Sequence, residues 1–232
     1  MGTFFQAYTQ ADFFGKLIFF ALFLLSTLCW VFLIQKFFMA RQMKRESQKF
    51  QHFAKIHKGE ILNLTISSYS PFALLYQSFK EKTLQILDKN HYFTSNKEER
   101  QNYLSYADVE FLTSHIHIVI AKQRGKIEKN LFILATTVTL APFLGLLGTV
   151  WGILITFGEL QAGHSVSSSS VILGGLSTAL TTTVLGLLIA IPALVAYSYF
   201  KNLSRYFTME MQSFSHFLLS TVELQYRKAD VL

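Results

Sequence analysis

The chain has little charge and almost no cysteine, and each shortage excludes a class of protein. Charged residues make up 15% of its 232 residues, whereas about 25% is usual for a soluble domain. Hydrophobic residues reach 51%, which excludes a chain that is mainly disordered. The single cysteine, Cys29, excludes an intramolecular disulfide, and no Cys/His group has the spacing of zinc ligands. Packing must therefore order this chain.

Charge is absent from three long stretches of 19, 29 and 41 residues, at 17–35, 130–158 and 160–200. About 20 apolar helical residues cross a bilayer core of about 30 Å, so each stretch is long enough. In the last stretch, residues 161–170 are small and polar, which indicates a connection before a single helix. We therefore predict an all-α integral membrane protein with three transmembrane helices, at 17–36, 131–158 and 171–200.

The basic residues predict the orientation. Residues 36–130 hold 16 of the 21 Lys and Arg and nine of the 14 acids, so the whole net charge of +7 lies there. By the positive-inside rule, 37–130 is a cytoplasmic segment and 201–232 a cytoplasmic C-terminal helix, while 1–16 and 159–170 are periplasmic. Nucleic-acid binding is the alternative explanation of the basic residues. Anionic lipid headgroups account for them better, because they flank membrane crossings.

The cytoplasmic segment has an amphipathic helical pattern. We expect helices around 40–57 and 72–89, and a third that begins at Ser95–Asn96 and continues into the membrane past Gly125. We find no phosphate-binding loop or paired catalytic groups, so we assign no enzyme activity, cofactor or catalytic residue. His115 and His117 point about 200° apart on a helix, which argues against a metal site.

The second and third transmembrane helices carry stripes of small and hydroxyl residues. One stripe contains Gly145, Gly148, Thr149, Gly152 and Thr156, and the other Gly175, Thr178, Ala179, Thr182, Gly186 and Ala190. Close helix packing is one explanation of such stripes. The other is a cavity lined by hydroxyls that hold water and relay protons, with Pro142 weakening the helix nearby. All three helices lack an internal Asp, Glu, Lys or Arg, so a titrating carboxylate would have to come from a partner.

Three blocks of sequence carry a recognisable pattern: Lys16–Ile18 with Trp30–Lys36, then Ala141–Ile153, then Gly186–Tyr197. They resemble the MotA/TolQ/ExbB proton-channel family, and the TolQ branch most, with the ExbB branch close behind. The resemblance implies an inner-membrane homopentamer around the single transmembrane helix of a TolR- or ExbD-like partner, which carries a membrane aspartate. It also implies coupling of the proton-motive force to work at the cell envelope.

The resemblance assigns roles to particular residues. Thr149 and Thr183 match the family's pore threonines, and Pro142 its helix-two proline. Thr178 stands where this family commonly has a glutamate, which is a departure from the pattern. With Thr182, Gly145 and Gly152 these residues form our predicted proton pathway. Two alternatives remain. The first is an ExbB-like subunit that energises TonB-dependent uptake; its further partner would be a TonB-like protein, whereas a Tol system would have a TolA-like protein. The second is a membrane scaffold that does not conduct protons.

Overall fold

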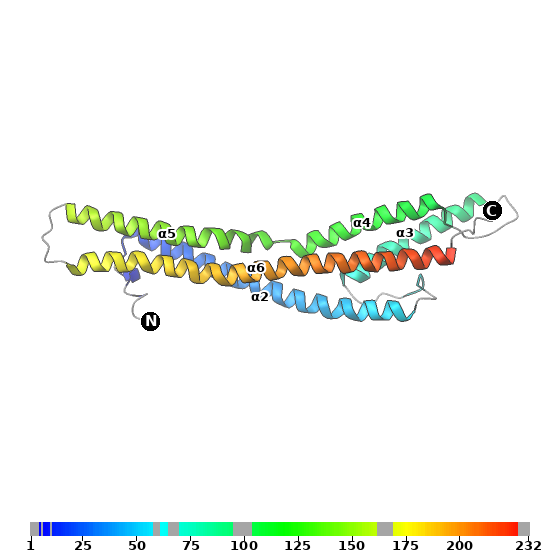
Figure 1. The fold of residues 1–232 in the computed structure, drawn as a ribbon, viewed down its shortest axis with the longest axis horizontal. Coiled ribbons are helices and arrows are strands. Elements are labelled where there is room, and N and C mark those ends of the chain that lie inside the picture. The colour runs from blue at the N-terminus through cyan, green and yellow to red at the C-terminus, as the bar shows by residue number, and fades with distance from the viewer. Residues whose placement is uncertain are drawn as a thin grey trace. The chain divides into compact units, whose positions relative to one another are not determined.

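The computed structural model describes residues 5, 7–9, 11–57, 61–64, 70–94, 104–161 and 169–226. All of its regular elements in these ranges are helices (Figure 1): α2 (Phe13–Ile56), α3 (Pro71–Thr94), α4 (Tyr106–Glu128), α5 (Leu131–Gln161) and α6 (Ser169–Tyr226). Parts of α2, α5 and α6 are long and apolar enough to cross a membrane. The predictions of an all-α chain and of three such helices are therefore confirmed for the described residues.

The chain divides into two compact units. We call residues 1–37 and 130–201 the membrane unit, and residues 38–129 and 202–232 the second unit. Helices α2 and α6 each contribute residues to both units.

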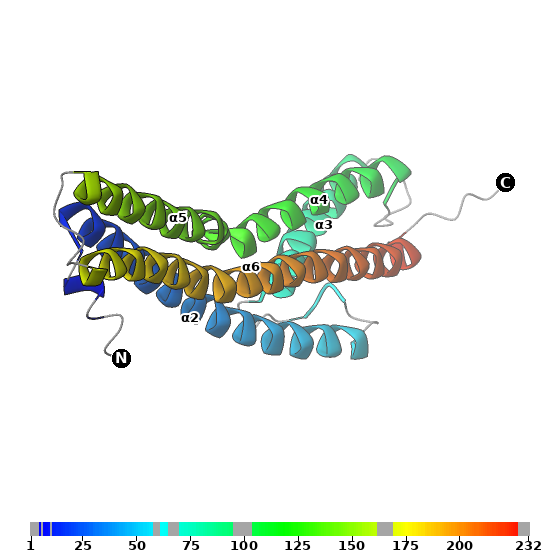
Figure 2. The same ribbon diagram turned by 60° about the vertical axis from the view of Figure 1, so that its left-hand side comes forward.

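The membrane unit consists of the first half of α2, all of α5 and the first part of α6, which lie side by side in both views (Figures 1 and 2). Ile18 and Leu22 of α2 pack there with Ala141 of α5 and Ala190 of α6. Many large side chains on the outside of this unit are exposed, such as Phe143 at 67%. This is the distribution expected where the surrounding medium is itself apolar.

The second unit has a core of large apolar side chains. Phe72, Tyr76 and Phe79 of α3 have no exposed surface, and they pack with residues of α2, α4 and α6. The Tyr76 hydroxyl donates a hydrogen bond to the Ile61 carbonyl at 2.6 Å. Burial raises the pKa of Tyr76 to about 12, because the charged phenolate is poorly solvated there.

Local capping residues fix where α3 and α4 begin. The Ser70 hydroxyl accepts a hydrogen bond from the Ala73 amide at 3.1 Å, and Pro71 takes the first helical position. At α4, Ser105 and Asp108 form a reciprocal capping box. Burial raises the pKa of Asp108, but hydrogen bonds from Ser105 and Asn90 and the charge of Lys89 outweigh it, so the net pKa is lowered.

Several expectations for the cytoplasmic segment need correction. Residues 40–56 continue α2 and do not form a separate helix, and α4 begins at Tyr106. The expected start at Ser95–Asn96 lies outside the described residues.

The expected uninterrupted run past Gly125 is also wrong. Gly125 lies inside α4, and the helix ends three residues later, at Glu128. Asn130 then adopts a φ of 65° before α5 begins at Leu131. Asparagine tolerates this left-handed conformation better than most residues, so the break falls at Asn130.

Candidate functional site

Helices α5 and α6 approach each other along the two stripes of small residues. A Cβ atom added to Gly145 would lie 2.9 Å from the Thr182 carbonyl oxygen and 2.9 Å from Thr183 Cα. One added to Gly152 would lie 2.7 Å from Ala179 Cβ. Such distances leave no room for a side chain, so the backbones themselves are in contact here. We call this contact, from Gly186 and Ala141 to Gly175 and Gly152, the α5–α6 seam.

Pro142 lies at one end of the seam, inside α5. Its neighbour Ala141 is fully buried, and a Cβ on Gly186 would lie 3.2 Å from the Ala141 carbonyl carbon. In a helix, the Val138 carbonyl would accept a hydrogen bond from the backbone N–H of residue 142. Because that residue is proline and has no N–H, this helical hydrogen bond cannot form. One helical hydrogen bond is therefore absent about one turn before Gly145, although α5 continues through Pro142.

Two threonines of α6 direct their hydroxyls at one backbone carbonyl of α5. Thr183 Oγ1 donates to the Gly145 carbonyl oxygen at 2.9 Å. Thr182 Oγ1 lies 3.2 Å from the same oxygen and 2.7 Å from the Ala179 carbonyl oxygen of its own helix. A hydroxyl has one proton, so the shorter distance makes Ala179 the main acceptor for Thr182. Thr182 is 2% exposed and belongs to the packed seam, whereas Thr183 is partly exposed.

Thr149 and Thr178 lie beside the seam and not in it. Thr149 is partly exposed and donates to the Leu146 carbonyl of its own helix at 2.7 Å. Thr178 donates to the Gly174 carbonyl at 2.9 Å and lies 3.5 Å from the carbonyl oxygen of Ala7. The structure thus joins Gly145, Thr182 and Thr183 by hydrogen bonds, and Gly152 by packing alone. Thr149 and Thr178 have separate hydrogen-bond partners.

Sequence reasoning missed a polar contact in the same unit, between Asp12 and Trp151. The Trp151 indole N–H donates to Asp12 Oδ2 at 3.0 Å, and the Phe14 ring packs against the indole in a tilted arrangement, with ring centroids 4.4 Å apart and an interplanar angle of 44°. Asp12 Oδ1 also accepts from the Gly15 amide at 2.9 Å, so this carboxylate caps α2. An Asp directly before a helix signals the cap. The sequence holds no signal for a partner 139 residues away.

The carboxylate of Asp12 is stabilised in its charged form. Burial raises its pKa, but the hydrogen bonds from Trp151 and from the amides of Gly15 and Phe14 outweigh this, so the net pKa lies below 3.8. Among the described residues, no group of three His, Cys, Asp or Glu side chains is placed to hold a metal ion.

The seam and its flanking threonines fall within a region shared with a known family. The profile described as the MotA/TolQ/ExbB proton channel family matches residues 85–213, which is more than half of the chain. The chain belongs to the MotA/TolQ/ExbB proton channel family. The match includes all seven candidate residues of the pathway. This is a transport family and not an enzyme family.

Curated relatives in the MotA/TolQ/ExbB family carry two different names. The chain is 34% identical over 107 residues to the biopolymer transport protein ExbB of Xanthomonas campestris pv. campestris, covering 46% of this chain and 42% of that protein. It is 35% identical over 117 residues to the Tol-Pal system protein TolQ of Pseudomonas aeruginosa, and the match covers 47% of this chain and 50% of that protein. The biopolymer transport protein ExbB of Aquifex aeolicus is 32% identical over 126 residues, and the match covers 54% of this chain and 73% of that protein. The chain thus spans about half the length of the first two relatives. Because its identities to the proteins named ExbB and TolQ are similar, they do not assign the chain to either branch of the family.

Proposed function

We propose that this chain is the channel subunit of a proton-driven motor of the TolQ type in the bacterial inner membrane. Five copies would surround the transmembrane helix of a TolR- or ExbD-like partner, and proton flow would do work at the cell envelope. The observation that carries the proposal is the α5–α6 seam, where hydroxyl groups lie between two apolar stretches, residues 131–158 and 171–200, that contain no Asp or Glu. A partner's membrane aspartate would supply the titrating group.

The hydrogen bonds of two threonines support the proposed pathway. Thr183 and Thr149 each donate their one proton to a backbone carbonyl, at 2.9 and 2.7 Å. A hydroxyl whose proton is committed in this way still has lone pairs with which to accept a hydrogen bond. Both hydroxyls would therefore act as oriented acceptors for a protonated carboxyl or a water molecule.

The remaining candidate residues would serve the pathway indirectly. Thr182, Gly145 and Gly152 hold the two helices together, and Pro142 leaves a backbone carbonyl free for water. Thr178 would replace the family's glutamate with a hydroxyl and water. In this topology the N-terminus and residues 159–170 are periplasmic, while residues 37–130 and the C-terminus are cytoplasmic.

Two other functions make different predictions. An ExbB-like subunit would energise TonB-dependent uptake, and the relatives named ExbB support that branch. A membrane scaffold that conducts nothing is favoured by the internally satisfied hydroxyls and by Thr178. Purification of the native complex from nanodiscs, with its intact mass, would separate these functions. Five copies with a single-span partner bearing a membrane Asp would support the motor, and the periplasmic domain of that partner would identify the branch.

Proton flux tests the pathway itself. The chain and its co-purified partner are reconstituted into vesicles, and Thr183→Val is compared with Thr183→Ser. We expect Val to lower the flux about tenfold, the equivalent of one hydrogen bond to a charged group, and Ser to retain it. Thr181→Val is the matched control, because Thr181 lies two residues away on the same helix, donates to the Ser177 carbonyl of α6 rather than to α5, and is not among the proposed pathway residues. Equal flux in all variants, with the complex mass unchanged, would reject the pathway.

A further inference from the structure

The residues before α2 contact both helices of the α5–α6 seam. Asp12 accepts the indole N–H of Trp151 on α5 at 3.0 Å. Ala11 packs with Leu185 of α6. All of these residues belong to the membrane unit. We call the described residues of 7–12, which join the two helices in this way, the N-terminal segment.

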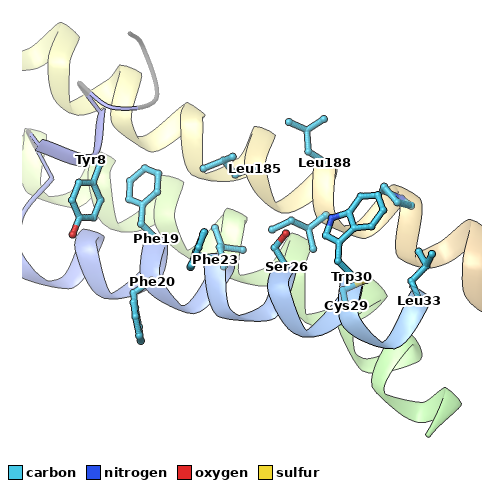
Figure 3. A pocket seen from close by; sticks show the side chains of 13 residues that line it. Tyr8, Phe19, Phe20, Phe23, Ser26, Cys29, Trp30, Leu33, Leu185 and Leu188 are labelled. Atoms are coloured by element: carbon cyan, nitrogen blue, oxygen red, sulfur yellow. The ribbon is translucent and has the colours of Figure 1, made fainter. Parts of the chain in front are cut away.

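Further contacts attach the N-terminal segment to α6. The Tyr8 ring meets the Phe19 ring edge to face, with centroids 5.9 Å apart, and Figure 3 shows both rings with Leu185 of α6. These three residues are among those that line a groove of about 580 Å³ between α2 and α6. Thr178 Oγ1 of α6 lies 3.5 Å from the Ala7 carbonyl oxygen. The N-terminal segment is therefore attached to α6 mainly by packing.

The Trp151 indole differs from the neighbouring hydroxyls of α5 in where it donates. Thr149 donates to the Leu146 carbonyl at 2.7 Å and Thr156 to the Gly152 carbonyl at 2.8 Å, both within α5. The indole donates to a residue outside α5. A hydrogen bond tolerates only a narrow range of distance and angle, so this contact restrains rotation of α5 about its own axis.

Rotation of α5 matters for the direction of the Thr149 hydroxyl. Residues two positions apart on an α-helix point about 200° apart, so Thr149 and Trp151 lie on opposite sides of α5. Any rotation that moves the indole turns the Thr149 side chain through the same angle. On a helix about 10–12 Å across, a rotation of about 12° displaces a surface atom by about 1 Å. The indole contact therefore controls a hydroxyl that it does not touch.

We propose that Asp12 is a positioning residue of the proton pathway, because its bond to the Trp151 indole fixes the rotation of α5 and with it the direction of the Thr149 hydroxyl. This inference rests on the proposed function. The role is distinct from capping α2, since the cap bond from the Gly15 amide uses Oδ1, at 2.9 Å. Oδ2 accepts from the indole at 3.0 Å and from the Phe14 amide at 3.3 Å.

Proton flux through the complex reconstituted with its co-purified partner separates positioning from capping. Asp12→Ser keeps a residue that caps helices well, but its hydroxyl is one bond shorter than a carboxylate oxygen and does not reach the indole. Trp151→Phe keeps an aromatic ring against Phe14 and removes the N–H. We expect each variant to lower the flux about tenfold, since a displacement of about 1 Å can slow a reaction about a hundredfold. The double variant should lower the flux no further.

Three further variants assign the effect. Asp12→Asn retains a side-chain oxygen that accepts from the indole, so it should restore most of the flux that Asp12→Ser loses. In a Thr149→Val background, Trp151→Phe should change the flux by less than about twofold, because the indole acts through Thr149. Glu159→Gln is the matched control, since it removes an exposed carboxylate from the same half of α5, and it should leave the flux unchanged.

The outcomes distinguish this proposal from the proposed function. Flux equal to wild type in both Asp12→Ser and Trp151→Phe, with the mass of the complex unchanged, would overturn the positioning role and leave the channel standing. Equal losses in Asp12→Asn and Asp12→Ser would also overturn it, by assigning the effect to the charge. A further tenfold loss from Trp151→Phe in the Thr149→Val background would do the same. A wild-type complex without proton flux would reject the proposed function, and the positioning role with it.

Discussion

In the second unit the residues without exposed surface include Phe72, Tyr76 and Phe79, whereas the α5–α6 seam buries Ala141, Gly145 and Thr182. The membrane unit instead leaves many of its large side chains outside. Water drives large apolar side chains into a core, but a hydrocarbon medium gives them no such advantage. Helices in the membrane are therefore held by close backbone approach and by hydrogen bonds. The two regions show how one chain uses two different means of packing.

The largest loss of folding stability should come from truncating an aromatic side chain in the second unit. Phe72→Ala removes a fully buried ring that packs near Phe207 and Phe214, and should lower the free energy of unfolding by about 3–5 kcal/mol. Phe143→Ala, at a position 67% exposed in the membrane unit, should change it little. Denaturant titration of the detergent-solubilised chain measures both. Similar losses would mean that the two regions do not pack differently.

A smaller loss of folding stability should follow from adding one methyl group to the α5–α6 seam. Gly145→Ala brings a Cβ to within 2.9 Å of the α6 backbone, and forcing the helices apart should cost about 1–3 kcal/mol. Gly125→Ala is the matched control, since nothing lies within 4 Å of its added Cβ. It should stabilise α4 by about 0.5–1 kcal/mol. Thermal unfolding in one detergent compares the two, and a neutral Gly145→Ala would refute backbone contact at the seam.

The Asp12 carboxylate should contribute about 1 kcal/mol as a helix cap, which Asp12→Ala would remove. Its folded-state pKa is lowered, so the charged form stabilises the fold above pH 3.8 and this contribution is lost as the pH falls through the lowered pKa. Asp12→Asn should keep the cap but lose this dependence on pH. Fluorescence of Trp151 in a Trp30→Phe background reports the contact. An emission spectrum unaffected by Asp12→Ala would contradict the hydrogen bond.

A similarly small loss of stability should follow from changing Tyr76, a buried phenol of the aromatic core. Tyr76→Phe removes the hydrogen bond to Ile61 and should cost about 1 kcal/mol. Because burial raises the pKa of Tyr76 to about 12, its contribution persists below pH 10 and declines as the pH rises toward 12. Tyr106→Phe, 80% exposed, should have no effect. Alkaline unfolding curves that coincide for wild type and Tyr76→Phe would contradict this assignment.

The sequence by itself determined the three apolar helices, the family and the small-residue stripes, because all of these are local in the chain. Uncharged length predicts a membrane crossing, and a repeat of three to four residues predicts a helix face. The role of the seven pathway residues stays a prediction. The sequence predicted no helix break between Gly125 and the membrane, whereas the structure has one at Asn130, which adopts a positive φ.

Only the tertiary structure decided which residues meet across the chain. Thr182 and Thr183 are adjacent in sequence, yet one is buried in the seam and the other is partly exposed with its hydroxyl on the Gly145 carbonyl. The pairing of Asp12 with Trp151 and the groove between α2 and α6 likewise join distant segments. Periodicity fixes the face of a helix on which a residue lies, but the partner of that face depends on how the helices pack together.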